Sequence, residues 1–143
     1  MGQAKAVVDR LWAALEAQRL EELGAICSPD IAVTMPGGVR LRGVAALGQV
    51  LGAYLAAFPD LRHEVVDVVE AGDKIALELR VTGTHTGTLQ TPNGPIPATG
   101  KPVAWESVDL VTVAGGKIAS WHAYYDQLAF LAQLGPQPGP ATA

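Results

Sequence analysis

The chain has 143 residues, a length that suits a single domain with a sizeable buried core. Hydrophobic residues make up 49% of it and charged residues 17%, which excludes a disordered polar segment. The formal net charge is −4 and the ten Lys and Arg residues are scattered, which argues against a nucleic-acid-binding surface.

The N-terminal part of the chain is predicted to hold helices and one hairpin. Apolar residues at helical spacing predict a helix over residues 4–17 and a second, short helix over residues 20–26. Residues 31–35 and 39–42 are predicted to be strands joined by a turn at Pro36-Gly37-Gly38. A further helix is expected from Val44 until Pro59 ends it, because its apolar residues fall on one face.

The rest of the chain is predicted to form a meander of strands and a closing helix. Strands are expected over residues 62–70, 74–86, 101–113 and 117–125, with a Pro- and Gly-rich loop over residues 87–100. The last helix is expected over residues 127–134, and residues 136–143 as a flexible tail. This order predicts one α+β domain, residues 1–135, with N-terminal helices packed in a strongly curved, mostly antiparallel sheet and a short C-terminal helix.

Three histidines are candidate functional groups. His85 lies at the end of the core-facing row of the strand over residues 74–86, either as a core histidine bonded to the backbone or as a pocket group suited to proton transfer. His122 shares the polar face of the last strand with Tyr124 and Asp126, where it can be exposed, lie in a dimer interface or have a functional role. His63, beside charged neighbours, is expected to face solvent.

Asp126 has two competing interpretations. It immediately precedes a helix, so it can act as the N-cap that accepts backbone N–H hydrogen bonds. It can also be a general acid or base. The helix dipole would lower the pKa of its carboxyl group, whereas burial in an apolar pocket would raise it.

The aromatic residues and the possible metal ligands do not point to one function. The aromatic residues near the C-terminus are either packing residues or the walls of a cavity for a flat substrate. The histidines and the one cysteine, Cys27, are dispersed, so neither a metal site nor an internal disulfide is expected. No apolar run reaches the roughly 18 residues needed to cross a bilayer, and no signal segment is recognisable, so we expect a cytoplasmic protein without membrane contact.

Several short strings span most of the chain after residue 55. They are Phe58-Pro59-Asp60, Gly83-Thr84-His85-Thr86-Gly87, Ala98-Thr99-Gly100-Lys101-Pro102, Gly116-Lys117-Ile118 with Trp121, and Tyr124-Tyr125-Asp126 followed by Gln133-Leu134-Gly135. These strings resemble those of the SnoaL-like polyketide cyclases, or ester cyclases, of the α+β cone superfamily that includes nuclear transport factor 2, and they fall where that fold would place them.

The resemblance implies an enzyme that closes a ring by an intramolecular aldol reaction, with no metal or organic cofactor. Asp126 matches the acid/base aspartate of the family, and His85 would lie beside it at the wall of a pocket for a small hydrophobic, carbonyl-bearing molecule. The other residues expected at this pocket are Trp105, Tyr124, His122, Phe58 and Tyr54.

Other functions on the same fold stay open. One is an epoxide hydrolase, for which Arg80, Asp109 and Asp67 would supply an Asp-Arg-Asp set. Another is a non-catalytic module for small-molecule binding or dimerisation. A homodimer through the open sheet face is expected, because Trp121 or Tyr125 on that face would otherwise be exposed in a large apolar patch.

Overall fold

The computed structural model of the protein describes residues 3–91 and 93–135. Pro92 of the Pro- and Gly-rich loop and the tail expected over residues 136–143 lie outside this range. In chain order the elements are α1 (Gln3–Glu16), the 3₁₀ turn η1 (Leu20–Glu22), α2 (Leu23–Ile26), β1 (Cys27–Met35), β2 (Val39–Arg42), α3 (Val44–Ala57), β3 (Arg62–Ala71), β4 (Lys74–Thr84), β5 (Leu89–Thr91), β6 (Gly94–Ile96), β7 (Pro102–Ala114), β8 (Lys117–Tyr125) and α4 (Gln127–Ala132).

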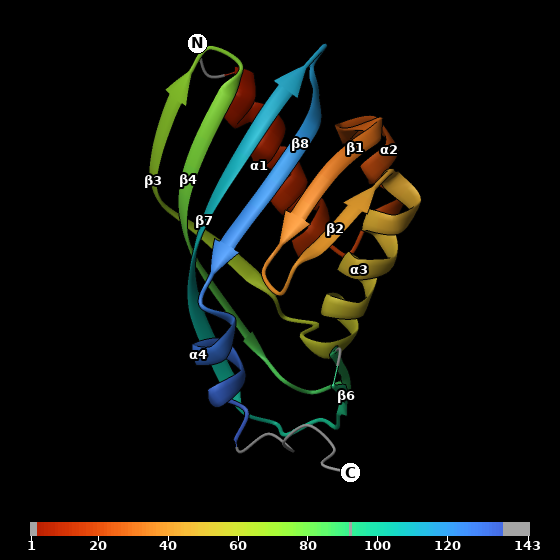
Figure 1. Cartoon of the computed structure of the whole chain (residues 1–143), viewed down its shortest axis with the longest axis vertical. Helices are drawn as coiled ribbons and strands as arrows, with labels where there is room; N and C mark the ends of the chain where they lie inside the picture. The colour runs from red at the N-terminus through yellow and green to blue at the C-terminus, as the bar shows by residue number, and fades with distance from the viewer. Residues whose placement is uncertain (1–2, 92, 136–143) are drawn as a thin grey trace.

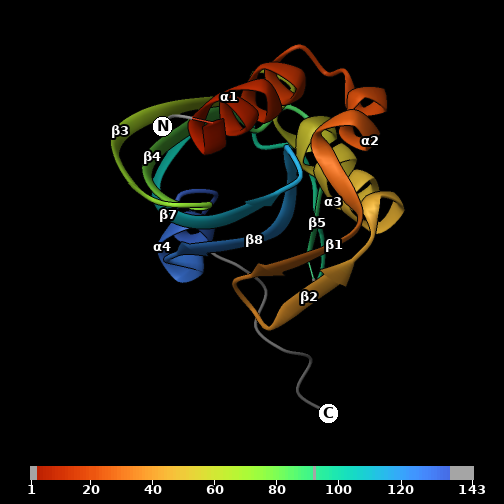
Figure 2. The same cartoon turned by 90° about the horizontal axis from the view of Figure 1, so that it is seen from above.

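The main sheet has six strands in the order β2-β1-β8-β7-β4-β3 and is strongly curved (Figure 1). All neighbouring strands run antiparallel except β1 and β8, which are parallel. The view from above shows α1 and α3 on the concave side of the sheet, whereas the outer side of β7 and β8 carries no helix along most of its length (Figure 2). The α+β class and the curved, mostly antiparallel sheet predicted from the sequence are therefore confirmed.

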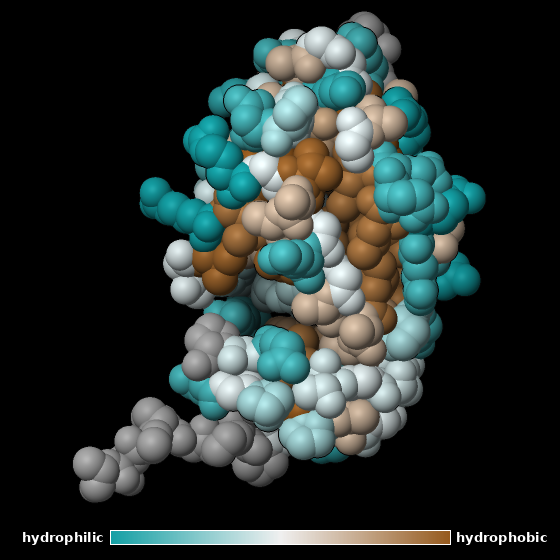
Figure 3. All heavy atoms as spheres, turned by 90° about the vertical axis from the view of Figure 1, so that its right-hand side faces the viewer, coloured by the Kyte–Doolittle hydropathy of each residue, from teal (hydrophilic) through white to brown (hydrophobic). Residues whose placement is uncertain are grey.

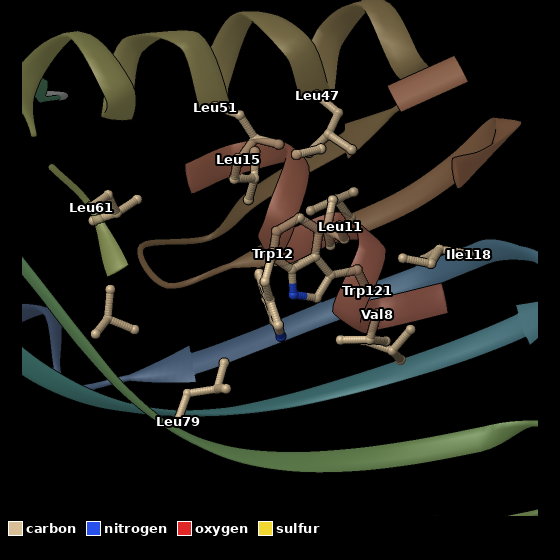
Figure 4. Packing of buried hydrophobic residues seen from close by; sticks show 14 of the residues in the cluster. Val8, Leu11, Trp12, Leu15, Leu47, Leu51, Leu61, Leu79, Ile118 and Trp121 are labelled. Carbon is tan, nitrogen blue, oxygen red and sulfur yellow. The ribbon is translucent and has the colours of Figure 1, made fainter. Parts of the chain in front are cut away.

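Helix α1 fills the space between the sheet and α3. Its apolar residues recur every three or four positions, so they form one face that is buried against both layers. Figure 4 shows Val8, Leu11, Trp12 and Leu15 from this face between Leu47 and Leu51 of α3 on one side and strand residues such as Leu79 and Trp121 on the other. The core thus lies in the concavity of the sheet.

The start of β1 and the loop over residues 87–100 differ from the predictions, and β4 ends at Thr84 rather than at residue 86. β1 begins at Cys27 rather than at residue 31, because Cys27 already pairs with Ile118 of β8. The register then shifts before Ala32, which accommodates Pro29, a residue that cannot donate to a regular ladder. The segment over residues 87–100 contains a second, two-stranded sheet, β5 and β6. It was predicted to be a loop because of its prolines and glycines.

The strings that suggested the family hold segments of the fold together. The Asp60 carboxylate accepts hydrogen bonds from the backbone N–H and the hydroxyl group of Thr84, both at 2.7 Å. The side-chain amide of Gln133 binds the N–H and the carbonyl oxygen of Ala104, which fixes the segment after α4 to β7. A Cβ atom at Gly87 would lie 1.9 Å from the carbonyl oxygen of Ala56, so only glycine fits against the end of α3.

The helices of residues 3–91 and 93–135 are too short or too polar to span a membrane; the longest, α1 and α3, have 14 residues each. On the side of the molecule that carries α3, the surface is hollowed and hydrophobic side chains are visible there (Figure 3).

Candidate active site

A pocket lies in the concavity of the sheet, between α1, α3 and the strands. Its cavity volume is about 70 Å³. Its walls are mostly apolar, with a few polar groups, as in many small-molecule sites. The lining residues are Trp12, Leu15, Met35, Leu51, Tyr54, Leu55, Leu61, His63, Leu79, Val81, Trp105, Ser107, Asp109, Trp121, Ala123 and Tyr125.

Asp109 is the buried carboxylate of this pocket. It lies on β7, in the inward-facing row with Trp105 and Ser107, and only 3% of its surface is exposed. The Ser107 hydroxyl donates to its Oδ1 at 2.5 Å, and Nε1 of Trp121, on the neighbouring strand β8, donates to its Oδ2 at 2.9 Å. These two hydrogen bonds fix the plane of the carboxylate, and each oxygen keeps acceptor capacity for a ligand.

Burial raises the pKa of the Asp109 carboxyl group above its usual value. The hydrogen bonds from Ser107 and Trp121 act in the opposite direction, because they stabilise the ionised form, but burial is the larger effect. A carboxyl group with a raised pKa in an apolar pocket can accept a proton and later return it.

Two tyrosines contribute hydroxyl groups to the same pocket. Tyr54 comes from α3 and Tyr125 from the end of β8, and their hydroxyl oxygens are 2.7 Å apart. Burial raises the pKa of both phenols, so both stay protonated at neutral pH. Because one hydroxyl donates to the other, the proton of the acceptor hydroxyl is still available to a ligand.

His63 and Trp12 form a further polar part of the pocket wall. The two rings are stacked, with centroids 4.3 Å apart and planes inclined by 13°. Burial lowers the pKa of His63 to about 4, so its imidazole is neutral at pH 7. The expectation that His63 faces solvent is wrong, because His63 pairs with Val81 on the inward face of β4.

Of the residues expected at the pocket, Tyr54 and Trp105 line it. Phe58 is fully buried behind this wall, with its ring centroid 6.1 Å from that of Trp105.

His85 is fully buried beside Phe58, outside the residues that line the pocket. The backbone N–H of Thr99 donates to Nδ1 of His85, which leaves the ring proton on Nε2. The backbone of His85 also binds Lys101 and Gly100, so this residue closes the base of the loop that carries β5 and β6. Its burial lowers the pKa of the imidazole.

Asp126, His122 and Tyr124 do not meet at the pocket. Asp126 is exposed and caps α4, with Oδ1 accepting the backbone N–H of Ala129 at 2.9 Å. His122 and Tyr124 point to the outer face of β8, since strand alternation directs Trp121, Ala123 and Tyr125 inward. The capping interpretation of Asp126 thus describes its geometry, and its catalytic role stays a prediction.

The Asp-Arg-Asp set is not assembled either. Arg80 and Asp67 are exposed on the outer face of the sheet, whereas Asp109 is buried inside.

The sequence contained a signal for Asp109. It belongs to a row of alternating residues that face one side of a strand, Val103, Trp105, Ser107, Asp109 and Val111. Burying a charged side chain in such a mostly apolar row costs free energy, so its presence there indicates a function. Within the described ranges no cluster of His, Cys, Asp and Glu side chains could hold a metal ion.

A family profile described as SnoaL-like polyketide cyclase matches residues 5–134. Two curated relatives are 31% identical over 103 residues, or 71% of this chain: the aklanonic acid methyl ester cyclases DnrD of Streptomyces peucetius and DauD of Streptomyces sp. strain C5. The matched segment spans 68% of the length of DnrD and 62% of that of DauD.

Several solved structures share the fold of this chain. AclR from Streptomyces galilaeus, a proposed hydroxylase, superposes with a TM-score of 0.80 at 28% identity, over 96% of this chain and 99% of AclR. IdmH from Streptomyces antibioticus, a proposed polyketide cyclase, gives 0.78 at 27% identity, over 94% and 99%. An epoxide hydrolase from M. tuberculosis shares the fold alone, with a TM-score of 0.72 at 16% identity over 94% of this chain and 90% of its own.

Proposed function

Because the chain belongs to the SnoaL-like polyketide cyclase family, we propose that it closes a ring in a polyketide-type substrate by general acid–base catalysis with Asp109 as the acid/base residue. The observation that carries this assignment is the single buried carboxylate of the pocket, held by Ser107 and Trp121 and surrounded by apolar and aromatic walls. The substrate class is a small hydrophobic molecule with several carbonyl groups.

The reaction needs only proton transfer and one new bond. The Asp109 carboxylate takes a proton from a carbon between two carbonyl groups, and the electron pair of that C–H bond forms an enolate. The enolate carbon attacks a ketone carbonyl of the same molecule, which forms the C–C bond and an alkoxide. Asp109 then returns the proton to the alkoxide, so the product is an isomer of the substrate. No electrons are exchanged with a redox group.

The pocket supports each step with a defined group. Apolar walls keep the pKa of Asp109 raised, which brings it toward the range in which a carboxyl group transfers protons both ways. The hydroxyl of the Tyr54–Tyr125 pair that retains a free proton can donate to an enolate or alkoxide oxygen. Trp105 and Trp121 supply flat surfaces for a planar ring system.

The test compares two carboxylates of this chain. Asp109→Asn removes the proton acceptor at nearly constant shape, and we expect turnover of aklanonic acid methyl ester, or of another polyketide methyl ester that the wild type converts, to fall by about 100-fold or more. Asp126→Asn is the matched control. Asparagine caps helices about as well as aspartate, so this variant is expected to stay within about twofold of the wild type.

The opposite result is equally informative. If Asp126→Asn abolished turnover while Asp109→Asn retained it, the family aspartate at position 126 would be the catalyst and the assignment of Asp109 would be wrong. A ¹³C NMR titration of the Asp109 carboxyl group checks the premise without any substrate: its pKa should lie above the ordinary value of 3.8.

We further propose that the protein acts in the cytoplasm as a homodimer and that residues 1–135 form its single domain. The outer face of β7 and β8 exposes Val108, Leu110 and Tyr124, with Tyr124 half-exposed at 52%. Trp121 and Tyr125, which were expected on this face, lie on the inner face instead. A second copy would therefore cover Val108, Leu110 and Tyr124, which form the outer patch.

A further inference from the structure

Trp12 and His63 carry polar atoms that the fold leaves without a partner. Trp12 is 4% exposed and its Nε1–H has no hydrogen-bond acceptor among the described residues. Nδ1 of His63 is likewise buried and has no partner within the described part of the chain. Most buried polar groups in proteins are hydrogen-bonded, and leaving one unpaired costs about 1–3 kcal/mol. Two such atoms on stacked rings therefore call for an explanation.

Both residues line the pocket and are linked to Asp109 through Trp121. Trp12 stacks on His63 and also meets Trp121 edge to face, with ring centroids 5.7 Å apart. Trp121 in turn donates its indole N–H to Asp109. His63, Trp12, Trp121 and Asp109 thus form a row of residues in contact along one wall of the pocket. Figure 4 shows the two indoles together between α1 and the sheet.

Trp12 and Trp121 differ in a way that packing alone does not explain. An apolar ring of similar size would fill the place of Trp12 without a buried N–H to satisfy. Trp121 has a partner for its N–H, whereas Trp12 has none in the fold. His63 is similar, since its burial keeps the imidazole uncharged at neutral pH and able to donate or accept one hydrogen bond at Nδ1.

We propose that Trp12 and His63 form a polar subsite that hydrogen-bonds an oxygen atom of the substrate, one aromatic ring away from the acid/base residue. The indole N–H is a donor only, so the ligand group must be an acceptor; a hydroxyl or carbonyl oxygen on an aromatic ring meets this requirement. This inference rests on the proposed function for the identity of the substrate, but it makes a binding prediction that needs no turnover. Its role is to orient the substrate and to select among analogues.

The experiment uses two probes of almost the same shape, 2-naphthol and 2-methylnaphthalene, with the wild-type protein labelled with ¹⁵N. On addition of 2-naphthol, the indole N–H resonance of Trp12 is expected to move downfield as it gains an acceptor. With 2-methylnaphthalene this shift should be absent. The indole of Trp121, already bonded to Asp109, serves as the internal reference and should respond about equally to both probes.

Variants then separate hydrogen bonding from packing. Trp12→Phe and His63→Phe keep an aromatic ring but remove the polar atoms, and each is expected to weaken 2-naphthol binding by about 3- to 10-fold while changing 2-methylnaphthalene binding by less than twofold. Asp109→Asn should retain the selectivity for 2-naphthol. Loss of turnover in that variant with selectivity intact would support both proposals, whereas full turnover would overturn only the proposed function.

The proposal is overturned if the Trp12 indole resonance responds identically to both probes, or if neither probe binds the wild type. It is also overturned if the two variants weaken both probes to the same extent, since the rings would then contribute packing alone. The NMR comparison in the wild-type protein decides the question even where a variant does not fold.

Discussion

His63 links the chemistry of the pocket to the stability of the fold. Burial lowers the pKa of its imidazole to about 4 in the folded protein, against the ordinary value of 6.5 in the unfolded chain. Between these two values the unfolded chain binds a proton that the folded chain does not. Stability therefore rises with pH across this window and is lost on acidification from about pH 6.5 toward pH 4.

We expect the free energy of unfolding of the wild type to fall by up to roughly 3 kcal/mol between pH 7 and pH 4 through this residue. Asp109 acts in the other direction, since its raised pKa favours the folded state when protonated, whereas His85, whose pKa burial also lowers, acts in the same direction as His63. Urea unfolding of the wild type and of His63→Gln at several pH values isolates the histidine. A variant with the same pH slope as the wild type would contradict the burial of His63.

The segments between the elements show why the family strings do not contain the proposed catalyst. Asp60, Thr84, Gly87 and Gln133 all fix strands or helix ends through the backbone, so their sequence pattern is local and recognisable. Asp109 lies in the middle of an alternating strand and needs no special turn. Strand alternation indicates that Asp109 faces inward, but that this inner face borders a pocket depends on how β7 curves against β8 and α1, which is a tertiary property.

Most helices and strands of the fold could be predicted from the sequence. Helix and strand positions followed from periodicity and from the positions of glycine and proline, whereas Tyr54 and Trp105 were expected at a pocket through the resemblance to the family. The inward and outward faces of β8 were harder, because the polar row Ser120–His122–Tyr124 resembles a functional face. The structure directs this row outward, since Trp121 must reach Asp109 and the core.

Gly87 provides a test of the contact between the end of α3 and the loop after β4. Its backbone N–H donates to the carbonyl oxygen of Ala57 at 3.1 Å, and a Cβ atom would overlap the neighbouring carbonyl of Ala56. Gly87→Ala should destabilise the protein by about 1–3 kcal/mol in urea unfolding. Gly24→Ala in α2, where nothing lies within 4 Å of the new atom, should be neutral or stabilising by up to about 1 kcal/mol. Equal effects of the two changes would show that the backbone contact is not tight.

At the scale of the whole molecule, charge is distributed unevenly around the outer patch. Arg40 and Arg42 lie on β2 at one edge of the sheet, and Glu78 and Asp67 face each other on β4 and β3 toward the other edge. A two-fold axis through the patch and parallel to the strands would bring Arg40 and Arg42 of one copy over the other edge of its partner, where Arg80 is exposed together with Glu78 and Asp67.

This arrangement predicts which substitution separates the copies. Leu110 is 47% exposed at the centre of the outer patch, so Leu110→Glu would place two carboxylates near the axis and is expected to give a monomer in sedimentation at micromolar concentration. Val69→Glu on β3, the control, adds the same charge at a more exposed valine (64%) away from the patch and should leave the dimer intact. Because Asp109 and its pocket lie on the opposite face of the same strands, the Leu110 variant should keep the selectivity for 2-naphthol. A wild-type protein that sediments as a monomer, or a dimer broken equally by both changes, would place the interface elsewhere.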